Sequence, residues 1–162
     1  MIRSFRYSWR ALSGAYAGGG AGLAVTIGLL GVVRPAAPVA WALAAAAALF
    51  LVYFARTVCR QMTRIELDET GIRARGPFAR AIRWDSLRSL RLDYYSTRRD
   101  ADGRTMQGGW MQLKFRDGRR TIRVDSELEG FAELAAMAAA EAARRGLALD
   151  PATAQNLEAL RF

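Results

Sequence analysis

The side chains able to do chemistry are few in this chain, and their types argue against most kinds of active site. The 162 residues include no histidine, so the commonest metal ligand and general base is missing. The single cysteine, Cys59, has no partner for an internal disulfide and does not make a metal site alone. Asp85, Asp93 and Asp125 are spaced as strand and turn residues, without a phosphate-binding loop or a serine-hydrolase motif. The sequence therefore predicts no catalytic residue, no metal, no cofactor and no small-molecule substrate, and we do not expect an enzyme.

Arginine dominates the charged residues. Of 24 basic residues only Lys114 is a lysine, and the formal net charge is +9. Residues 1–59 carry +5, residues 60–125 carry +7 and residues 126–162 carry −3. The arginine excess and the alanine runs indicate a bias in the base composition of the genome rather than selection for arginine chemistry. Few exposed aromatic residues are interleaved with the arginines. Nucleic acid is therefore not expected as a partner.

Two uncharged runs near the N-terminus are long enough to act as membrane spans. Residues 11–33 contain no charge, and 23 residues of helix exceed the hydrocarbon thickness of roughly 30 Å. Residues 39–55 form a second run, and the sequence RPAAP between the runs indicates a turn. We predict a transmembrane helical hairpin over residues 1–59, with spans at about 11–33 and 39–56. Two buried soluble helices, or a cleaved signal peptide for the first run, are the alternatives.

Arginines gather at the outer ends of this predicted hairpin. Only Arg34 lies in the turn between the spans. The positive-inside rule then places both termini in the cytoplasm. The outer arginines would lie beside the lipid headgroups and form a basic membrane surface: Arg3, Arg6, Arg10, Arg56, Arg60 and Arg64.

Small residues form a stripe along the first span. Gly14, Gly18 and Gly22 recur every four residues and therefore share one face of a helix. Such stripes let a second helix approach closely in lipid. The neighbour is either the second span, whose alanine run covers residues 42–48, or a helix of a partner protein. We expect the glycine face to meet a partner and the alanine run to serve the hairpin.

After Arg64 the apolar residues recur with a period of two. This alternation predicts half-buried antiparallel strands, with the arginines on the solvated face. The sequence RDGR at residues 116–119 is a strong hairpin signal. We predict one core between the strands and a following helix, formed by Leu67, Ile82, Leu90, Leu113, Phe115, Ile122, Val124 and Phe131.

Two helices are expected after the strands. Ser126 and Glu129 have the spacing of a capping box at the start of the first, and Gly146 suits its end. Asp150 followed by Pro151 predicts the start of a short second helix, in a C-terminal tail over residues 147–162.

Four stretches of the second half carry a resemblance to a known superfold. They read IELDETGIRARGP, IRWDSLRSLRL, LKFRDGRRTIRV and SELEGF. With them, residues 60–146 resemble the pleckstrin-homology-like (PH-like) domain that some bacterial membrane proteins append to a transmembrane hairpin. The resemblance implies an α+β protein whose hairpin is followed by six or seven antiparallel strands and a capping helix. The lipid-binding members have a basic first hairpin, whereas this one reads LDETGI, so no ligand residue is transferred.

The fold hosts binders and scaffolds alike, so the expected function rests on surfaces. We expect a non-catalytic accessory or assembly subunit of a bacterial inner-membrane complex, with membrane proteins as partners. The segment 96–109 is long for a hairpin loop and supplies Arg98, Arg99 and Arg104 as candidate partner contacts. The alternative is a membrane-anchored module that binds anionic lipid headgroups or a cytoplasmic peptide.

Overall fold

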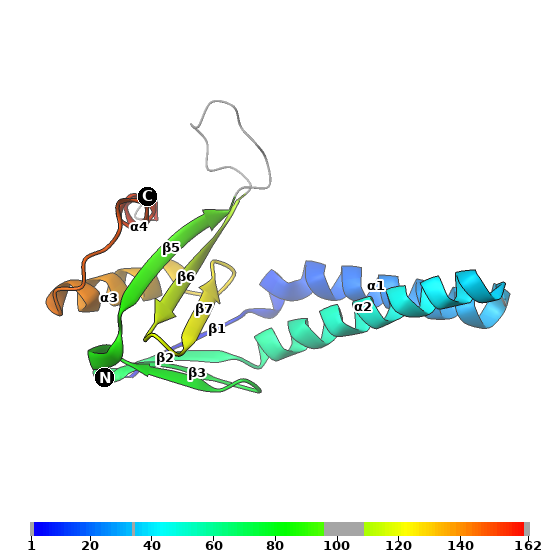
Figure 1. The fold of residues 1–162 in the computed structure, drawn as a ribbon, viewed down its shortest axis with the longest axis horizontal. Helices are drawn as coiled ribbons and strands as arrows, with labels where there is room; N and C mark the ends of the chain where they lie inside the picture. The colour runs from blue at the N-terminus through cyan, green and yellow to red at the C-terminus, as the bar shows by residue number, and fades with distance from the viewer. Residues whose placement is uncertain (1, 34, 96–108, 161–162) are drawn as a thin grey trace, which may run out of the picture. The chain divides into compact units, whose positions relative to one another are not determined.

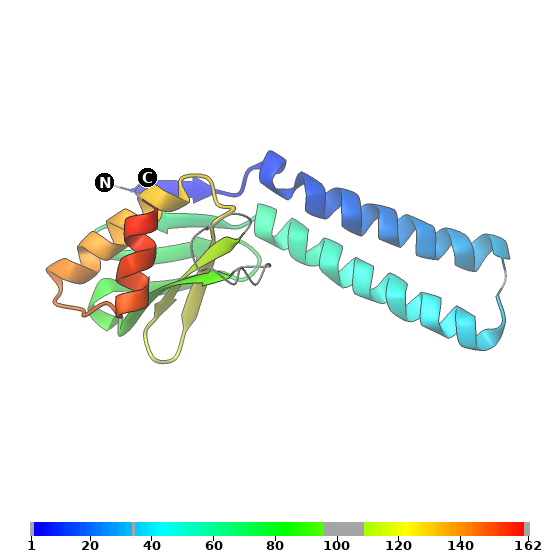
Figure 2. The ribbon, with the colours of Figure 1, turned by 90° about the horizontal axis from the view of Figure 1, so that it is seen from above.

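The computed structural model describes residues 2–33, 35–95 and 109–160. The chain divides into two compact units. A helical unit covers Tyr7–Met62, and a sheet unit combines Met1–Arg6 with Thr63–Phe162 (Figures 1 and 2). Each unit is described by itself.

The helical unit consists of two antiparallel helices, α1 (Trp9–Val33) and α2 (Ala37–Gln61), which lie side by side (Figure 1). Both are long and apolar enough to cross a membrane, which confirms the two predicted helices. Both extend beyond the predicted spans because arginine is a good helix former and does not end a helix. Pro38 lies in the first turn of α2, where the missing amide hydrogen is not needed.

The serine and threonine hydroxyl groups of Ser13, Thr26 and Thr57 bond to the backbone of their own helix. Thr26 Oγ1 donates to the carbonyl of Gly22 at 2.9 Å, and Thr57 Oγ1 donates to that of Tyr53 at 3.0 Å. Ser13 Oγ likewise donates to a carbonyl in the preceding turn. Such bonding leaves no hydroxyl hydrogen of these residues in need of water, as an apolar surrounding requires.

The described residues of the sheet unit form seven strands in two antiparallel sheets rather than one continuous sheet. A single 3-10 turn, η1 (Trp84–Ser86), separates the sheets along the chain. The four-stranded sheet has the order β1 (Arg3–Arg6), β2 (Arg64–Leu67), β3 (Gly71–Arg75) and β4 (Arg80–Arg83). The three-stranded sheet has the order β5 (Ser89–Tyr95), β6 (Trp110–Arg116) and β7 (Thr121–Asp125).

The first strand lies outside the region where the sequence analysis expected strands. β1 pairs with β2 in antiparallel register, from Arg3 opposite Leu67 to Arg6 opposite Arg64. Phe5 on β1 is buried, and the backbone amide of Glu129 donates to the carbonyl of Arg6. The helical hairpin is therefore inserted between two neighbouring strands of one sheet. Residues 1–6, expected in the first domain over residues 1–59, belong to the sheet unit.

The predicted alternation is observed in the strands. All eight residues expected in the core are buried, and several of them have no exposed surface, including Leu113, Phe115 and Val124. Asp117 and Gly118 form the β6–β7 turn, where Gly118 has a φ of 98° that favours glycine. The arginines of the same strands lie on exposed positions, as in Arg73 and Arg123.

The helix α3 (Phe131–Arg144) begins later than the capping box predicted. Its N-cap is Gly130, which has a φ of 76° and no side chain to cap with. Ser126 instead pairs with Met111: its hydroxyl accepts from the Met111 amide at 3.0 Å. The capping-box prediction was wrong because the Ser126 hydroxyl, at the end of β7, bonds to the neighbouring strand instead of capping the helix. The predicted end of the helix is confirmed by the left-handed Gly146.

The helix α4 (Pro151–Ala159) begins as predicted, with Asp150 accepting from the backbone amide of Thr153. It is not a separate tail. Thr153 Oγ1 accepts from the Leu92 amide at 3.0 Å, and Asn156 Nδ2 donates to the Leu92 carbonyl at 2.6 Å. Because β5 is an edge strand, α4 covers backbone groups that would otherwise be open to another strand (Figure 2).

Candidate functional site

The three glycines of the predicted stripe have different surroundings. A side chain at Gly14 or Gly18 would meet nothing within 4 Å. A side chain at Gly22 would collide with the Phe50 ring of α2. At Gly19, outside the stripe, a methyl group would lie 2.9 Å from Tyr53 Cδ1. The hairpin seam therefore uses Gly19 and Gly22, whereas Gly14 and Gly18 lie on a surface that the hairpin leaves open.

Aromatic side chains fill the rest of the hairpin seam. Tyr16 stacks on Trp9 at a centroid distance of 5.4 Å and meets Phe54 edge-on at 5.4 Å. The Tyr16 hydroxyl donates to Gln61 Oε1 at 2.5 Å. The expectation that the alanine run would form the hairpin contact missed these rings, because spacing alone does not show which glycine lies under an aromatic side chain.

Three arginines of the sheet unit lie together at one end of the four-stranded sheet. Arg6 and Arg64 are directly opposite each other on β1 and β2, and Arg64 is opposite Arg75 on β3. Arg3 lies at the other end of β1, 3.5 Å from Glu133 of α3. The register therefore brings Arg6 and Arg64 together from positions 58 residues apart and separates them from Arg3.

The remaining arginines of the predicted membrane surface belong to the helical unit. Arg10 and Arg56 are exposed on α1 and α2. The guanidinium of Arg60 lies over the Tyr7 ring, 5.2 Å from its centroid. The loop arginines Arg98, Arg99 and Arg104 lie outside the described residues.

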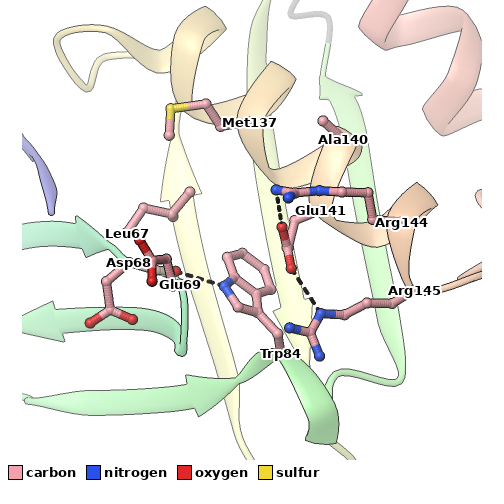
Figure 3. A pocket seen from close by; sticks show the side chains of 9 residues that line it. All are labelled: Leu67, Asp68, Glu69, Trp84, Met137, Ala140, Glu141, Arg144 and Arg145. Atoms are coloured by element: carbon pink, nitrogen blue, oxygen red, sulfur yellow. Dashed lines mark hydrogen bonds and ion pairs between the residues drawn. The ribbon is translucent and has the colours of Figure 1, made fainter. Parts of the chain in front are cut away.

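A groove of about 490 Å³ opens between α3 and the β2–β3 turn (Figure 3). Trp84 forms part of its wall: the indole is 3% exposed, and its Nε1 donates to the Asp68 carbonyl at 2.8 Å. No sequence pattern indicates a role for this groove. Its lining is Leu67, Asp68, Glu69, Trp84, Met137, Ala140, Glu141, Arg144 and Arg145.

The charged groups of this groove are held in fixed pairs. Asp68 accepts from the Thr70 hydroxyl at 2.5 Å, the Thr70 amide at 2.8 Å and the Gly71 amide at 2.9 Å. These hydrogen bonds lower the pKa of Asp68, the Thr70 hydroxyl contributing most. Glu141 Oε1 lies 2.8 Å from Arg145 Nε. These contacts hold the Asp68 and Glu141 carboxylates in place at the groove.

A second cluster lies where β5 ends and β6 begins. Tyr95 and Trp110 are cross-strand partners and stack at a centroid distance of 4.5 Å. Lys114 Nζ donates to Asp93 Oδ2 and to the Tyr95 hydroxyl, both at 2.8 Å. These bonds, first that to Asp93, raise the pKa of Lys114. The only lysine of the chain is thus a structural partner of an exposed aromatic pair.

Within the described residues, no three histidine, cysteine or acidic side chains are grouped to hold a metal ion. The expected absence of catalysis and of cofactors stays a prediction. No protein-family model matches the chain, and neither a curated protein nor a solved structure matches it.

Proposed function

We propose that the protein is a non-catalytic accessory or assembly subunit of a bacterial inner-membrane complex. In this proposal α1 and α2 cross the membrane, both termini are cytoplasmic, and the sheet unit is a PH-like domain at the cytoplasmic face. Membrane proteins are the partners, and two surfaces meet them: the open glycine face of α1 and the sheet unit.

The pairing of β1 with β2 carries the proposal. These strands precede α1 and follow α2, so both ends of the hairpin return to one sheet. Strands β1 and β2 can pair only if they lie on the same side of the membrane. Two crossings by the hairpin place them on the same side, whereas a single crossing would separate them. The apolar side chains support the same conclusion: none of the residues in the apolar window of α2 and 11% of those in α1 are buried. Helices in the core of a soluble protein would be covered.

The strand order supports the PH-like assignment. Four meandering strands, three meandering strands and then a helix follow the chain order expected for that superfold. The hairpin takes the place of the first turn, between β1 and β2. The fold alone does not assign a ligand, so the function depends on the surfaces.

The test compares two glycines of α1 at nearly the same depth. Gly18 and Gly20 both have open surroundings, but they lie about 160° apart around the helix. Co-purification in mild detergent, followed by mass spectrometry, would compare wild type with Gly18→Leu and Gly20→Leu. We expect the leucine at position 18 to push a partner helix away and to reduce the co-purified proteins, while position 20 retains them.

Thermal unfolding of the sheet unit is the control, because neither substitution touches its core. Retention of every partner by both variants would remove the glycine face from the proposal.

A second candidate function is a module that binds anionic lipid headgroups. The alignment of Arg6, Arg64 and Arg75 at one end of the sheet favours it. Each cation close to an anionic leaflet contributes about 1 kcal/mol to membrane association. The positive-inside distribution accounts for the arginines nearest the spans, so the accessory-subunit proposal is preferred.

A further inference from the structure

The β3–β4 turn, residues 76–79, lies at the end of the sheet from which the chain enters and leaves the helical hairpin. Arg6, the last residue of β1, is opposite Arg64, the first of β2, and Arg64 is opposite Arg75, the last of β3. Arg6 is three residues before the start of α1, and Arg64 is three residues after the end of α2. Three residues of chain span at most about 11 Å. The Cα atoms of Arg6 and Arg64 therefore lie within about 11 Å of the ends of α1 and α2 to which they connect.

Phe78 is exposed at the tip of this turn. It is 74% exposed, the largest value among the exposed large apolar residues described in the sheet unit. Gly76 has a φ of 154°, which glycine permits, and the ring of Pro77 fixes its own φ. A single exposed apolar residue needs no explanation on a protein surface. Phe78 differs because its position is tied by the strand register to the segments that enter the membrane.

The strand ends beside the β3–β4 turn carry only basic side chains. Arg75 and Arg80 flank the turn, and Arg6 and Arg64 end the neighbouring strands. The nearest carboxylate on these strands is Glu66, 2.8 Å from Arg75 Nε. The opposite end of the sheet carries both signs of charge: its β2–β3 turn contains Asp68 and Glu69, and Arg3 and Arg83 end β1 and β4 there. This end-to-end difference matches a surface with anionic headgroups on one side and solvent on the other.

We propose that the β3–β4 turn rests on the anionic membrane surface, with the Phe78 ring among the headgroups and acyl-chain ends. Arg75 and Arg80 then lie at the level of the lipid phosphates. An aromatic ring favours this interface, and basic residues beside it add attraction to anionic lipid. The inference deepens the proposed function, because it rests on α1 and α2 crossing the membrane. It adds a third contact with the bilayer, which would limit rotation of the sheet unit about its two linkers.

The experiment uses the full chain in vesicles and measures contact with lipid at single positions. Cys59 is replaced by serine, and single cysteines are introduced as Leu49→Cys, Phe78→Cys or Glu69→Cys and labelled with an environment-sensitive fluorophore. Leu49 is 72% exposed on α2 and reports insertion of the hairpin. Glu69 lies in the turn at the opposite end of the sheet and is the matched control. The quencher is phosphatidylcholine brominated on its acyl chains, held at one mole fraction, and the remaining lipid is either unbrominated phosphatidylcholine or phosphatidylglycerol.

We expect strong quenching at positions 49 and 78 and little at position 69. Phosphatidylglycerol should increase the quenching at position 78, and the double variant Arg75→Gln, Arg80→Gln should abolish that increase. Quenching at 49 without quenching at 78 above the level at 69 would overturn the inference while leaving the membrane hairpin intact. Absence of quenching at 49 would overturn the proposed membrane anchor itself. Equal quenching at 78 in the two lipid mixtures would overturn the role of the arginines.

Discussion

The two units of this protein use the same apolar residue types in opposite ways. In the hairpin, Val32 is 85% exposed and Leu49 is 72% exposed. In the sheet unit, Val124 and Leu113 have no exposed surface. The sheet unit completes its own core, whereas the hairpin leaves most of its apolar surface for other molecules to cover. The exposure of these side chains, and not their type, distinguishes the open surface of the hairpin from the core of the sheet unit.

The largest expected effect of a single truncation lies in the sheet core. Leu113→Ala should lower the free energy of unfolding of the sheet unit by about 2–5 kcal/mol, because the cavity is enclosed on all sides. Leu49→Ala should change it by less than about 0.5 kcal/mol. Denaturant unfolding in mild detergent, followed by near-ultraviolet circular dichroism, measures both. Equal losses at the two positions would mean that the hairpin and the sheet share a core.

A charged residue introduced on the exposed face of α2 should weaken membrane insertion of the hairpin and leave the stability of the sheet unit unchanged. An arginine in place of Leu49 should cost about 2.5–3.5 kcal/mol of membrane insertion, because its charge would face lipid. Alkaline extraction of membranes should then release part of the protein. The matched control is Ala143→Arg on an exposed position of α3, which should leave the protein membrane-bound. Full retention of Leu49→Arg would place this face of α2 against protein or water.

A smaller effect is expected where α4 covers the edge of β5. Thr153→Val would keep the shape of the side chain but leave the buried Leu92 amide without its acceptor, at a cost of about 1–3 kcal/mol. Gln155→Ala, on an exposed position of the same helix, should cost little. Hydrogen exchange at the Leu92 amide should rise in the first variant and not in the second. Unchanged exchange in Thr153→Val would show that α4 does not protect this edge.

The smallest effect concerns pH. Backbone hydrogen bonds lower the pKa values of Asp117 and Asp150, led by the amides of Arg120 and Thr153, and Thr70 lowers that of Asp68. A lowered pKa in the folded state gives stability that is present above the unfolded-state pKa of about 3.9 and is lost as the pH falls through the folded value. Stability should therefore decrease below about pH 4 and stay nearly constant from pH 5 to 8, since no histidine titrates there.

Thermal unfolding across this pH range is the measurement, with Asp150→Asn as the comparison. The variant should lose less stability on acidification than wild type. A steep change in wild-type stability near neutral pH would contradict this account.

Patterns with a clear period predicted most of the fold. The alternation from Ile65 to Val124 correctly gave the buried faces, and the uncharged runs gave both long helices. β1 was missed because four residues beside an apolar run carry too little periodicity to show a strand. Its partner, β2, lies 58 residues further along the chain at the Arg6–Arg64 pair, and local sequence does not encode such a pairing. The start of α3 was misplaced for a related reason, since Ser126 bonds across to Met111.

The candidate surfaces were predictable only in part. The spacing of Gly14, Gly18 and Gly22 correctly indicates a shared helix face, but the Phe50 ring decides that Gly22 belongs to the hairpin seam. The grouping of Arg6, Arg64 and Arg75 depends on strand register. Phe78 resembled an ordinary turn residue until that register placed it at the end of the sheet nearest the helix connections.

The most direct test of the central claim is the side of the membrane on which each end of the hairpin lies. Single cysteines at Ser4, Ala36 and Glu69 in a Cys59→Ser background would be labelled with a membrane-impermeant maleimide in intact bacterial spheroplasts. We expect labelling at position 36 in intact spheroplasts, and labelling at positions 4 and 69 only after permeabilisation. Labelling of position 4 and position 69 from opposite sides would contradict this expectation, because β1 and β2 could not then pair in one sheet.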